Sequence, residues 1–102
     1  MNGAERIAAE RKRQIEKEDW SAWHDDSENK DNKLALAAVC YALPRLLRHL
    51  VMDSQELLIH ILWPWDYKWW KPTPNNRIRE LEKAGALIAA EIDRLLRLEE
   101  EK

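Results

Sequence analysis

Apolar side chains recur at helical spacing in residues 76–98, where they fall three or four positions apart. Steps of three and four bring side chains onto one face of an α-helix, so the pattern predicts a last helix that packs lengthwise on its partners. Asn75 or Asn76 can cap its first turn. A glycine in its middle gives a flat spot where another backbone or a Trp ring could lie close. The seam consists of Ile78, Leu81, Gly85, Ile88, Ile92 and Leu95.

A first helix is expected over residues 4–19, because this stretch is rich in Ala, Glu, Arg, Lys and Gln. It holds few large apolar side chains, so it should lie on the surface of the other helices. Residues 28–32 are polar enough to form a loop, in which Asp31 or Asn32 can cap the next helix.

Two further helices are predicted in the middle of the chain. Residues 33–52 begin with a run that is apolar nearly all round, which predicts a central buried helix. Pro44 removes a backbone donor and clashes with the preceding turn, so this helix should break there. A short helix over residues 54–62 is expected to follow a capping box, with Asp53 as N-cap and Glu56 three positions later.

Residues 63–75 hold four of the six tryptophans and three of the four prolines. Proline fixes φ and pushes the preceding residue out of the helical region, so no regular helix should run through this segment. A cluster of Trp rings is either part of a core or the wall of a pocket, and the sequence leaves both open. The fold class expected is all-α: a small bundle of three to four helices with an ordered Trp/Pro-rich loop, in one domain over residues 1–102.

Composition narrows the classes of function. The net charge is −2, which gives no basic field for nucleic acid. A single cysteine, Cys40, excludes an internal disulfide and a multi-cysteine zinc site, and suits a reducing cytoplasm. No apolar run approaches the roughly 18 residues that span a bilayer, and the first residues lack the apolar core of a signal peptide. A soluble, cytoplasmic protein with no membrane or nucleic-acid partner is expected.

The sharpest chemical hypothesis is a pocket for a nucleotide-derived ligand. Arg11 and Arg13 offer fork donors for phosphate, and Trp20, Trp23 or Trp69 can stack on a base. A carboxylate would accept hydrogen bonds from hydroxyl groups, and each arginine could instead be solvated or pair with a neighbouring Glu. The carboxylates considered are Asp25 and Asp66, and the whole set of candidate ligand-binding residues is Arg11, Arg13, Trp20, Trp23, His24, Asp25, Asp26, Trp65, Asp66, Trp69, Trp70 and Lys71.

The tract His24-Asp25-Asp26 offers ligand types that suit a divalent ion, which keeps a metal-dependent nucleotide phosphohydrolase as a second alternative. Adjacent loop residues do not easily point at one ion, and no histidine pair has the spacing of a zinc helix. No nucleophile motif is visible, and Cys40 lies in apolar sequence. We therefore predict no catalytic residues, no metal and no cofactor.

Three stretches resemble an uncharacterised family of short proteins encoded by phages and prophages of gut bacteria. They are residues 13–21 followed by His24-Asp25-Asp26, the Trp-Pro-Trp-Asp loop that ends in Trp-Trp-Lys-Pro, and residues 81–94. A fainter similarity is to the ryanodine-receptor repeat, a helical module that in some settings holds an adenine nucleotide with a Trp against the base. Trp20, Asp25 and Asp26 match its Trp and acidic pair, while Asp19 replaces its glycine.

Chemistry and resemblance together predict a non-enzymatic binding protein for a nucleotide-derived small molecule. A phage protein of this kind would sequester a host immune signal, an anti-defence role. The first alternative is a protein-interaction inhibitor of a host defence enzyme that uses the Trp-rich loop, including Tyr67, as a hot spot. The last helix could also pack against its copy in a homo-oligomer.

Overall fold

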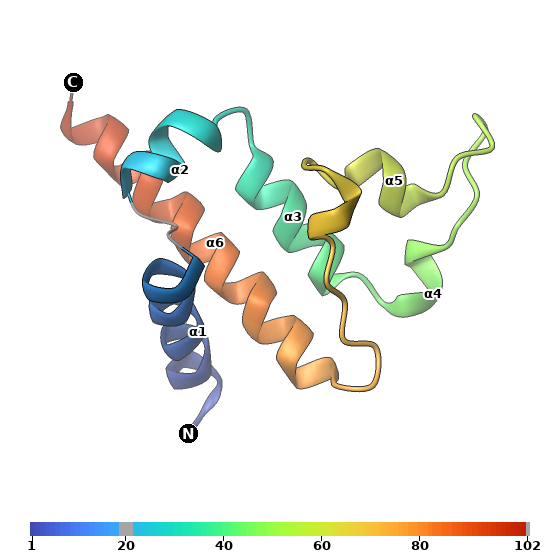
Figure 1. The fold of residues 1–102 in the computed structure, drawn as a ribbon, viewed down its shortest axis with the longest axis horizontal. Coiled ribbons are helices and arrows are strands. Elements are labelled where there is room, and N and C mark those ends of the chain that lie inside the picture. Colours follow the sequence, from blue (N-terminus) through green and yellow to red (C-terminus); the bar gives the residue numbers. More distant parts are fainter. Residues whose placement is uncertain (19–21, 102) are drawn as a thin grey trace.

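The computed structural model describes residues 1–18 and 22–101 (Figure 1). Within them all regular structure is helical apart from one isolated bridge between Val51 and Leu57. The all-α prediction is therefore confirmed. The elements in order are α1 (Gly3–Glu18), α2 (Ala22–Glu28), α3 (Lys33–Ala42), α4 (Arg45–Arg48), α5 (Leu58–Leu62), the 3-10 turn η1 (Tyr67–Trp69) and α6 (Arg77–Glu100).

Helix α6 is the element on which the others pack. It runs between α1 on one side and α3 on the other, and α2 contacts it as well (Figure 1). The short helices α4 and α5 lie beyond α3, away from α1. The side chain of Asn76 accepts a hydrogen bond from the Arg79 amide at 3.1 Å, so the predicted cap of this helix is confirmed. The molecule is flat, with extents of 42 × 34 × 21 Å.

The core lies between α3, α5 and α6 and under the aromatic segment, the name used below for residues 63–75. Small side chains on the inner face of α6 let α3 approach closely, because alanine adds little width to a helix surface. The buried hydrophobic cluster consists of Leu34, Ala37, Ala38, Cys40, Tyr41, Ile59, Trp63, Ala84, Leu87 and Ala90.

The predicted orientation of the last helix is wrong. Its large apolar seam does not face the core, since these side chains are 46–60% exposed: Ile78, Leu81, Ile88, Ile92 and Leu95. The inner face instead carries Ala84, Leu87 and Ala90 together with the buried charged residues Glu80 and Glu91. Arg48 and Arg94 pair with these two glutamates, so their charges are neutralised inside the protein. Charged residues usually lie on the exposed face of a helix, and here that rule fails.

The glycine of the seam is covered by the first helix. A Cβ built on Gly85 would lie 2.5 Å from Cδ1 of Ile7, closer than packed atoms come. The flat spot predicted at this position therefore receives an isoleucine of α1, which lets the two helices approach here.

The break at Pro44 is confirmed. Helix α3 ends at Ala42, and Pro44 occupies the N-cap position of the separate helix α4. Arg48 of α4 then turns back onto the end of α3, where it donates hydrogen bonds to the carbonyl oxygens of Cys40 and Tyr41 at 3.0 and 2.9 Å. These bonds satisfy carbonyls that the end of a helix leaves without a partner.

The capping box predicted at residues 53–56 is wrong. The N-cap of α5 is Leu57, which makes no side-chain cap bond. The preceding residues form a tight turn instead, in which the Met52 amide donates to the carbonyl of Glu56 and Gln55 takes a φ of 66°. The local pairing of Val51 with Leu57 places the chain in this turn, which the sequence pattern alone did not reveal.

Two other local features differ from expectation. No helix is predicted from the sequence over residues 22–28, where α2 forms. Asn32 does occupy the N-cap position of α3, but it has a left-handed backbone with φ 65° and its side chain makes no cap bond. Short polar residues adopt this conformation readily. The sequence therefore indicated where α3 begins, but not that Asn32 would take a left-handed backbone instead of making a cap bond.

Candidate functional site

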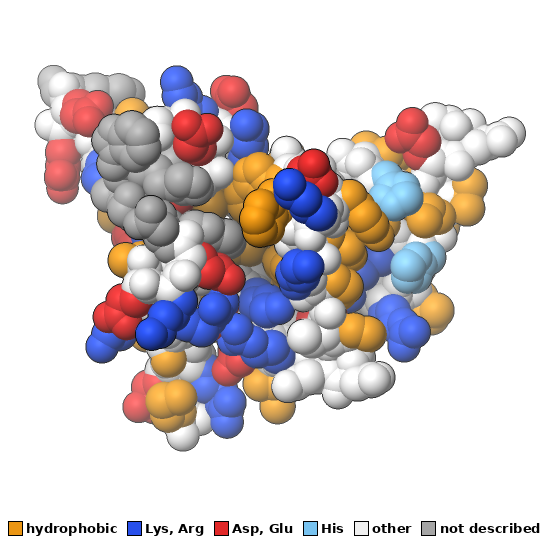
Figure 2. Space-filling view, viewed as in Figure 1, with side chains coloured by type: hydrophobic (Ala, Val, Ile, Leu, Met, Phe, Trp, Pro, Cys, Tyr) orange, Lys and Arg blue, Asp and Glu red, His pale blue; other side chains and the backbone are white. Residues whose placement is uncertain are grey.

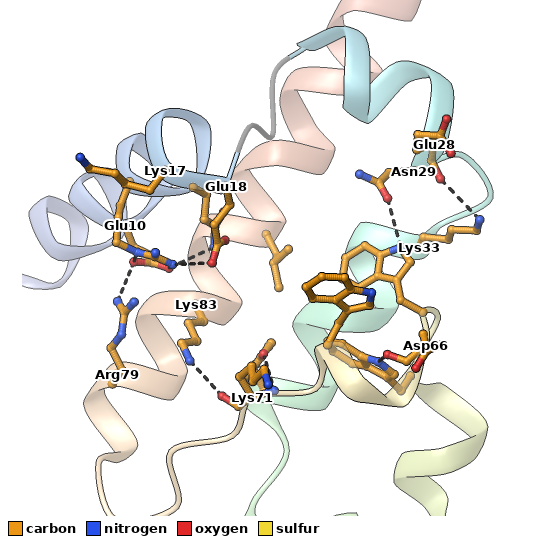
Figure 3. Close-up of a pocket in the computed structure, with 17 residues that line it drawn as sticks. Glu10, Lys17, Glu18, Glu28, Asn29, Lys33, Asp66, Lys71, Arg79 and Lys83 are labelled. Carbon is orange, nitrogen blue, oxygen red and sulfur yellow. Dashed lines mark hydrogen bonds and ion pairs between the residues drawn. The ribbon is translucent and has the colours of Figure 1, made fainter.

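A pocket of about 1090 Å³ opens between α1 and the aromatic segment (Figure 3). Helices α6 and α3 contribute further lining residues, and Glu28 and Asn29, at the end of α2 and just after it, line another side. Ligand pockets for drug-sized molecules usually enclose about 300–1000 Å³, so this one has room for a nucleotide. Its two walls differ in chemistry, one being cationic and the other aromatic.

The cationic wall is built by α1, α6 and the end of the aromatic segment. Figure 2 shows Lys and Arg side chains gathered on this face beside the hydrophobic side chains of its centre. The cations that line the pocket are Arg13, Lys17, Lys33, Lys71, Arg79 and Lys83. The acidic groups that line it are Glu10, Glu18, Glu28 and Asp66.

Glu10 fixes two of these arginines. It is buried and accepts hydrogen bonds from Arg13 Nε at 2.8 Å and from Arg79 Nη1 at 2.6 Å. Burial by itself would raise the pKa of the Glu10 carboxyl, but the bonds and charges of Arg13 and Arg79 outweigh it and hold the pKa below the ordinary 4.5. Glu10 is therefore ionised at neutral pH and ties α1 to α6 beside the pocket.

Lys83 is a half-buried ammonium group in the pocket. Its Nζ donates to the carbonyl of Lys71 at 2.9 Å and lies 5.4 Å from the centre of the Tyr41 ring. Burial, and next the nearby charge of Arg79, lower the pKa of Lys83. Within residues 1–18 and 22–101 no carboxylate lies at ion-pair distance from the amino groups of Lys17, Lys71 or Lys83. An anion in the pocket would meet ammonium groups that need a partner.

The aromatic wall combines core and pocket functions. Trp63 is buried and packs edge-to-face with Trp65 at 5.3 Å between ring centres. The Trp65 indole donates its N–H to Asn29 Oδ1 at 3.2 Å, which connects the wall to the residue after α2. Trp69, by contrast, is 60% exposed at the pocket. The indoles therefore serve both purposes that the sequence left open: Trp63 belongs to the core and also lines the pocket, Trp65 and Trp69 line the pocket, and Trp70 packs against the core.

The aromatic segment is held in place by hydrogen bonds to α3, to α6 and within itself. The Lys71 amide donates to the Tyr41 hydroxyl at 3.3 Å, and the Thr73 amide donates to Glu80 Oε2 at 3.2 Å. Trp63 Nε1 donates to the carbonyl of Asp66 at 3.1 Å, which closes the first turn of the segment on itself. These bonds replace the helical ladder that the prolines forbid, so the wall is ordered without regular structure.

Gln14 supplies a polar group that the sequence did not single out. It is buried in the pocket lining, and its Nε2 donates to Glu10 Oε2 at 3.2 Å. Its Oε1 is a buried acceptor with no hydrogen-bond partner in the part of the chain that the structure describes. Buried polar atoms are normally satisfied, so an orphan acceptor beside a pocket is a candidate contact for a ligand.

The pocket brings together a part of the predicted set. The residues of that set that line it are Arg13, Trp65, Asp66, Trp69 and Lys71. Trp20 lies outside the described residues. For Trp23 and His24 the structure describes only the helical backbone of α2.

Four predicted residues lie elsewhere. Arg11 points toward buried Asp25, with Nη2 3.6 Å from its Oδ2. Asp26 receives hydrogen bonds from the Arg97 guanidinium at 2.8–3.2 Å. Trp70 packs on Tyr41 with 4.7 Å between ring centres and is not part of the pocket lining. These groups hold the helices together.

Other lining residues could have been found from helical spacing. Gln14 follows Glu10 by four positions and Lys17 follows Arg13 by four, so both continue one face of α1. Lys83 continues the face of α6 that carries Arg79 in the same way. The sequence did not reveal that this face of α1 and this face of α6 both lie beside the aromatic segment.

Among the described residues no group of three His, Cys, Asp or Glu side chains is arranged to hold a metal ion. No helix in this part of the chain has the length and apolar character needed to cross a membrane. Comparison with known proteins found no matching family model, no matching curated protein and no matching solved structure. The function is therefore inferred from the chemistry of the site.

Proposed function

We propose that the protein binds a nucleotide-derived small molecule, without turning it over, in the pocket between α1 and the aromatic segment. The observation that carries this proposal is the pairing of two walls in one concavity. Ammonium groups that have no carboxylate partner within residues 1–18 and 22–101 line one side, and the indoles of Trp65 and Trp69 line the other. A ligand that carries both phosphate and a flat base matches these two walls.

In this proposal the residues have roles that differ in part from those expected from sequence. Lys83 and Lys71 would bind the phosphate, a role supported by their place in the pocket lining and by the bond from Lys83 to the carbonyl of Lys71. Trp69 offers an exposed face for stacking on the base. The Gln14 oxygen would accept from an amino group or a ribose hydroxyl. Arg11 has no role here, since its guanidinium pairs internally.

The two alternative functions have less support. A projecting hot spot needs several exposed aromatic anchors. Of the four residues predicted for it, Tyr67 and Trp69 are exposed, whereas Trp65 is half-buried against Trp63 and Trp70 packs beneath the guanidinium of Arg48 at 5.2 Å. A metal-dependent phosphohydrolase needs carboxylates that converge on one ion. Asp25 and Asp26 point instead to the different partners Arg11 and Arg97.

The experiment is a titration of mono-, di- and cyclic nucleotides and ADP-ribose at fixed salt, followed by Trp fluorescence and thermal melting. We expect one ligand class to give a saturable fluorescence change and a raised melting temperature. Trp69→Ala should abolish the response. Tyr67→Ala is the matched control, because Tyr67 is a similarly exposed aromatic residue of the same turn that contacts His60 and does not line the pocket.

Two results would overturn the proposal. One is a flat response across the whole panel, and the other is an equal loss in both variants. Chromatography of the ligand after incubation separates binding from turnover, because a binding protein returns it unchanged. Sequestration of a host signal by a phage protein stays a prediction of the sequence resemblance.

A further inference from the structure

An apolar stripe runs along α6 on the side that α1 and α3 leave open. It consists of the five exposed residues Ile78, Leu81, Ile88, Ile92 and Leu95. Their spacing puts them in one line, about 25 Å long at the rise of 1.5 Å per residue. The row is interrupted at Gly85, which Ile7 of α1 covers, and on either side of that position half-exposed Ile and Leu side chains of this number are unusual for a surface without a partner.

The two ends of the stripe have complementary shapes. At its start lies an apolar groove of about 190 Å³ between α1 and α6, whose lining includes Ile7, Ile78 and Leu81. At its other end the last turns of α6 carry Leu95 and Leu96, which are about half exposed. In Figure 1 this end of α6 projects past α2. One end thus offers a depression and the other offers apolar side chains of a size to enter it.

The ends are complementary in charge as well. Two half-exposed arginines lie at the start of the stripe: Arg77 of α6, which also bonds Glu80 and the end of α3, and Arg6 of α1, which pairs with Glu82 and lines the groove. The helix ends in an acidic run that begins at Glu99. Opposite charges meet when two copies of this helix lie antiparallel, whereas parallel helices would bring like charges together.

We propose that two copies of this chain pair through the α6 stripe, antiparallel, about a two-fold axis at Ile88. Positions equally far from Ile88 then lie opposite each other across the two copies. Leu81 meets the Leu95 of the second copy, and Arg77 meets its Glu99, because each pair lies seven or eleven residues to either side of the axis. The Leu95–Leu96 end of each copy fills the groove of the other.

Pairing leaves the pocket open. The residues of α6 that line the pocket, Arg79, Lys83 and Leu87, lie on the other side of the helix from the stripe. Pairing and ligand binding are therefore separate properties, and a failure of one does not bear on the other.

The first test is molar mass in solution by light scattering and sedimentation equilibrium, from about 1 to 100 µM. The parent chain should form a dimer, and Ile88→Glu should be a monomer, since it sets two carboxylates against each other at the axis. Leu46→Glu is the matched control: Leu46 is 88% exposed in α4, outside the stripe, and this variant should still dimerise. Circular dichroism checks that each variant is folded.

The second test fixes the direction. Leu81→Cys and Leu95→Cys are made separately and treated with a short bismaleimide, alone and mixed. An antiparallel pair cross-links only in the mixture, because identical positions lie about 21 Å apart along the helices. The parent chain, with Cys40 buried, is the control. A monomer at all concentrations, a dimer that survives Ile88→Glu, or self-cross-linking of the single variants would overturn the proposal.

Discussion

Arg48 is the residue whose loss should be most costly to the fold. It is 3% exposed, and its guanidinium donates to two carbonyls at the end of α3 and to Glu80 Oε2 at 2.8 Å. Arg48→Met keeps much of the side-chain length but removes every hydrogen-bond donor, so the buried Glu80 carboxylate loses its Arg48 partner. Removing one partner of a buried ion pair costs about 3–5 kcal/mol. Arg77 also bonds Glu80 and the carbonyl of Tyr41, so it offsets part of the loss.

We therefore expect Arg48→Met to lower the free energy of unfolding by about 3–5 kcal/mol, out of a total of about 5–15 kcal/mol for a domain of this size. The assay is urea unfolding at 25 °C and pH 7, followed by Trp fluorescence and circular dichroism. Arg45→Met is the matched control, since Arg45 is an exposed arginine of the same helix. A loss below about 1 kcal/mol would refute the ion-pair reasoning, because it is within the range of one ordinary hydrogen bond.

Three further predictions follow from single contacts. Burial alone would raise the pKa of Glu80, but the hydrogen bond and charge of Arg48 hold it below the ordinary 4.5. The ionised Glu80 therefore stabilises the fold fully above pH 4.5, and this stabilisation is lost as the pH falls below that value. Glu80→Gln should make the free energy of unfolding depend less on pH in this acidic range. Gly85→Ala should lower the melting temperature despite better helix propensity, because its methyl group overlaps Ile7, and Ile7→Ala in the same chain should restore part of the loss. Burial raises the pKa of Cys40 to about 11, so its reaction with a thiol reagent at pH 8 should be slow and should become fast in urea.

The parts of the fold that follow local rules could be predicted from the sequence. The cap at Asn76 and the break at Pro44 each depend on a few neighbouring residues. The orientation of α6 could not be predicted in this way. Its inner face contains Glu80, whose partner Arg48 lies 32 positions away, and no local pattern reveals that a charged residue will be neutralised in the core.

The candidate site also combines features that follow from neighbouring residues with features that depend on tertiary packing. The proline-rich aromatic segment was recognisable as an ordered unit, and Trp65 and Trp69 do line the pocket. Arg11 and Arg13 are two positions apart and point about 200° apart around a helix, so both cannot face one pocket. Arg11 is the one that turns away, toward Asp25 and Asp93, and the positions of these carboxylates come from tertiary packing.

The proposed function is tested most directly by calorimetric titration of a nucleoside diphosphate into three proteins: the parent chain, Lys83→Ala and Lys12→Ala. Lys12 is the matched control, an exposed lysine of α1 that does not line the pocket. We predict saturable binding of one ligand per chain that weakens with added salt. Loss of one charge-assisted bond at Lys83 should weaken it roughly tenfold or more, and Lys12→Ala should bind as the parent does. Absence of binding to the parent at millimolar ligand, or equal affinity of the parent and Lys83→Ala, would contradict the assignment of this pocket.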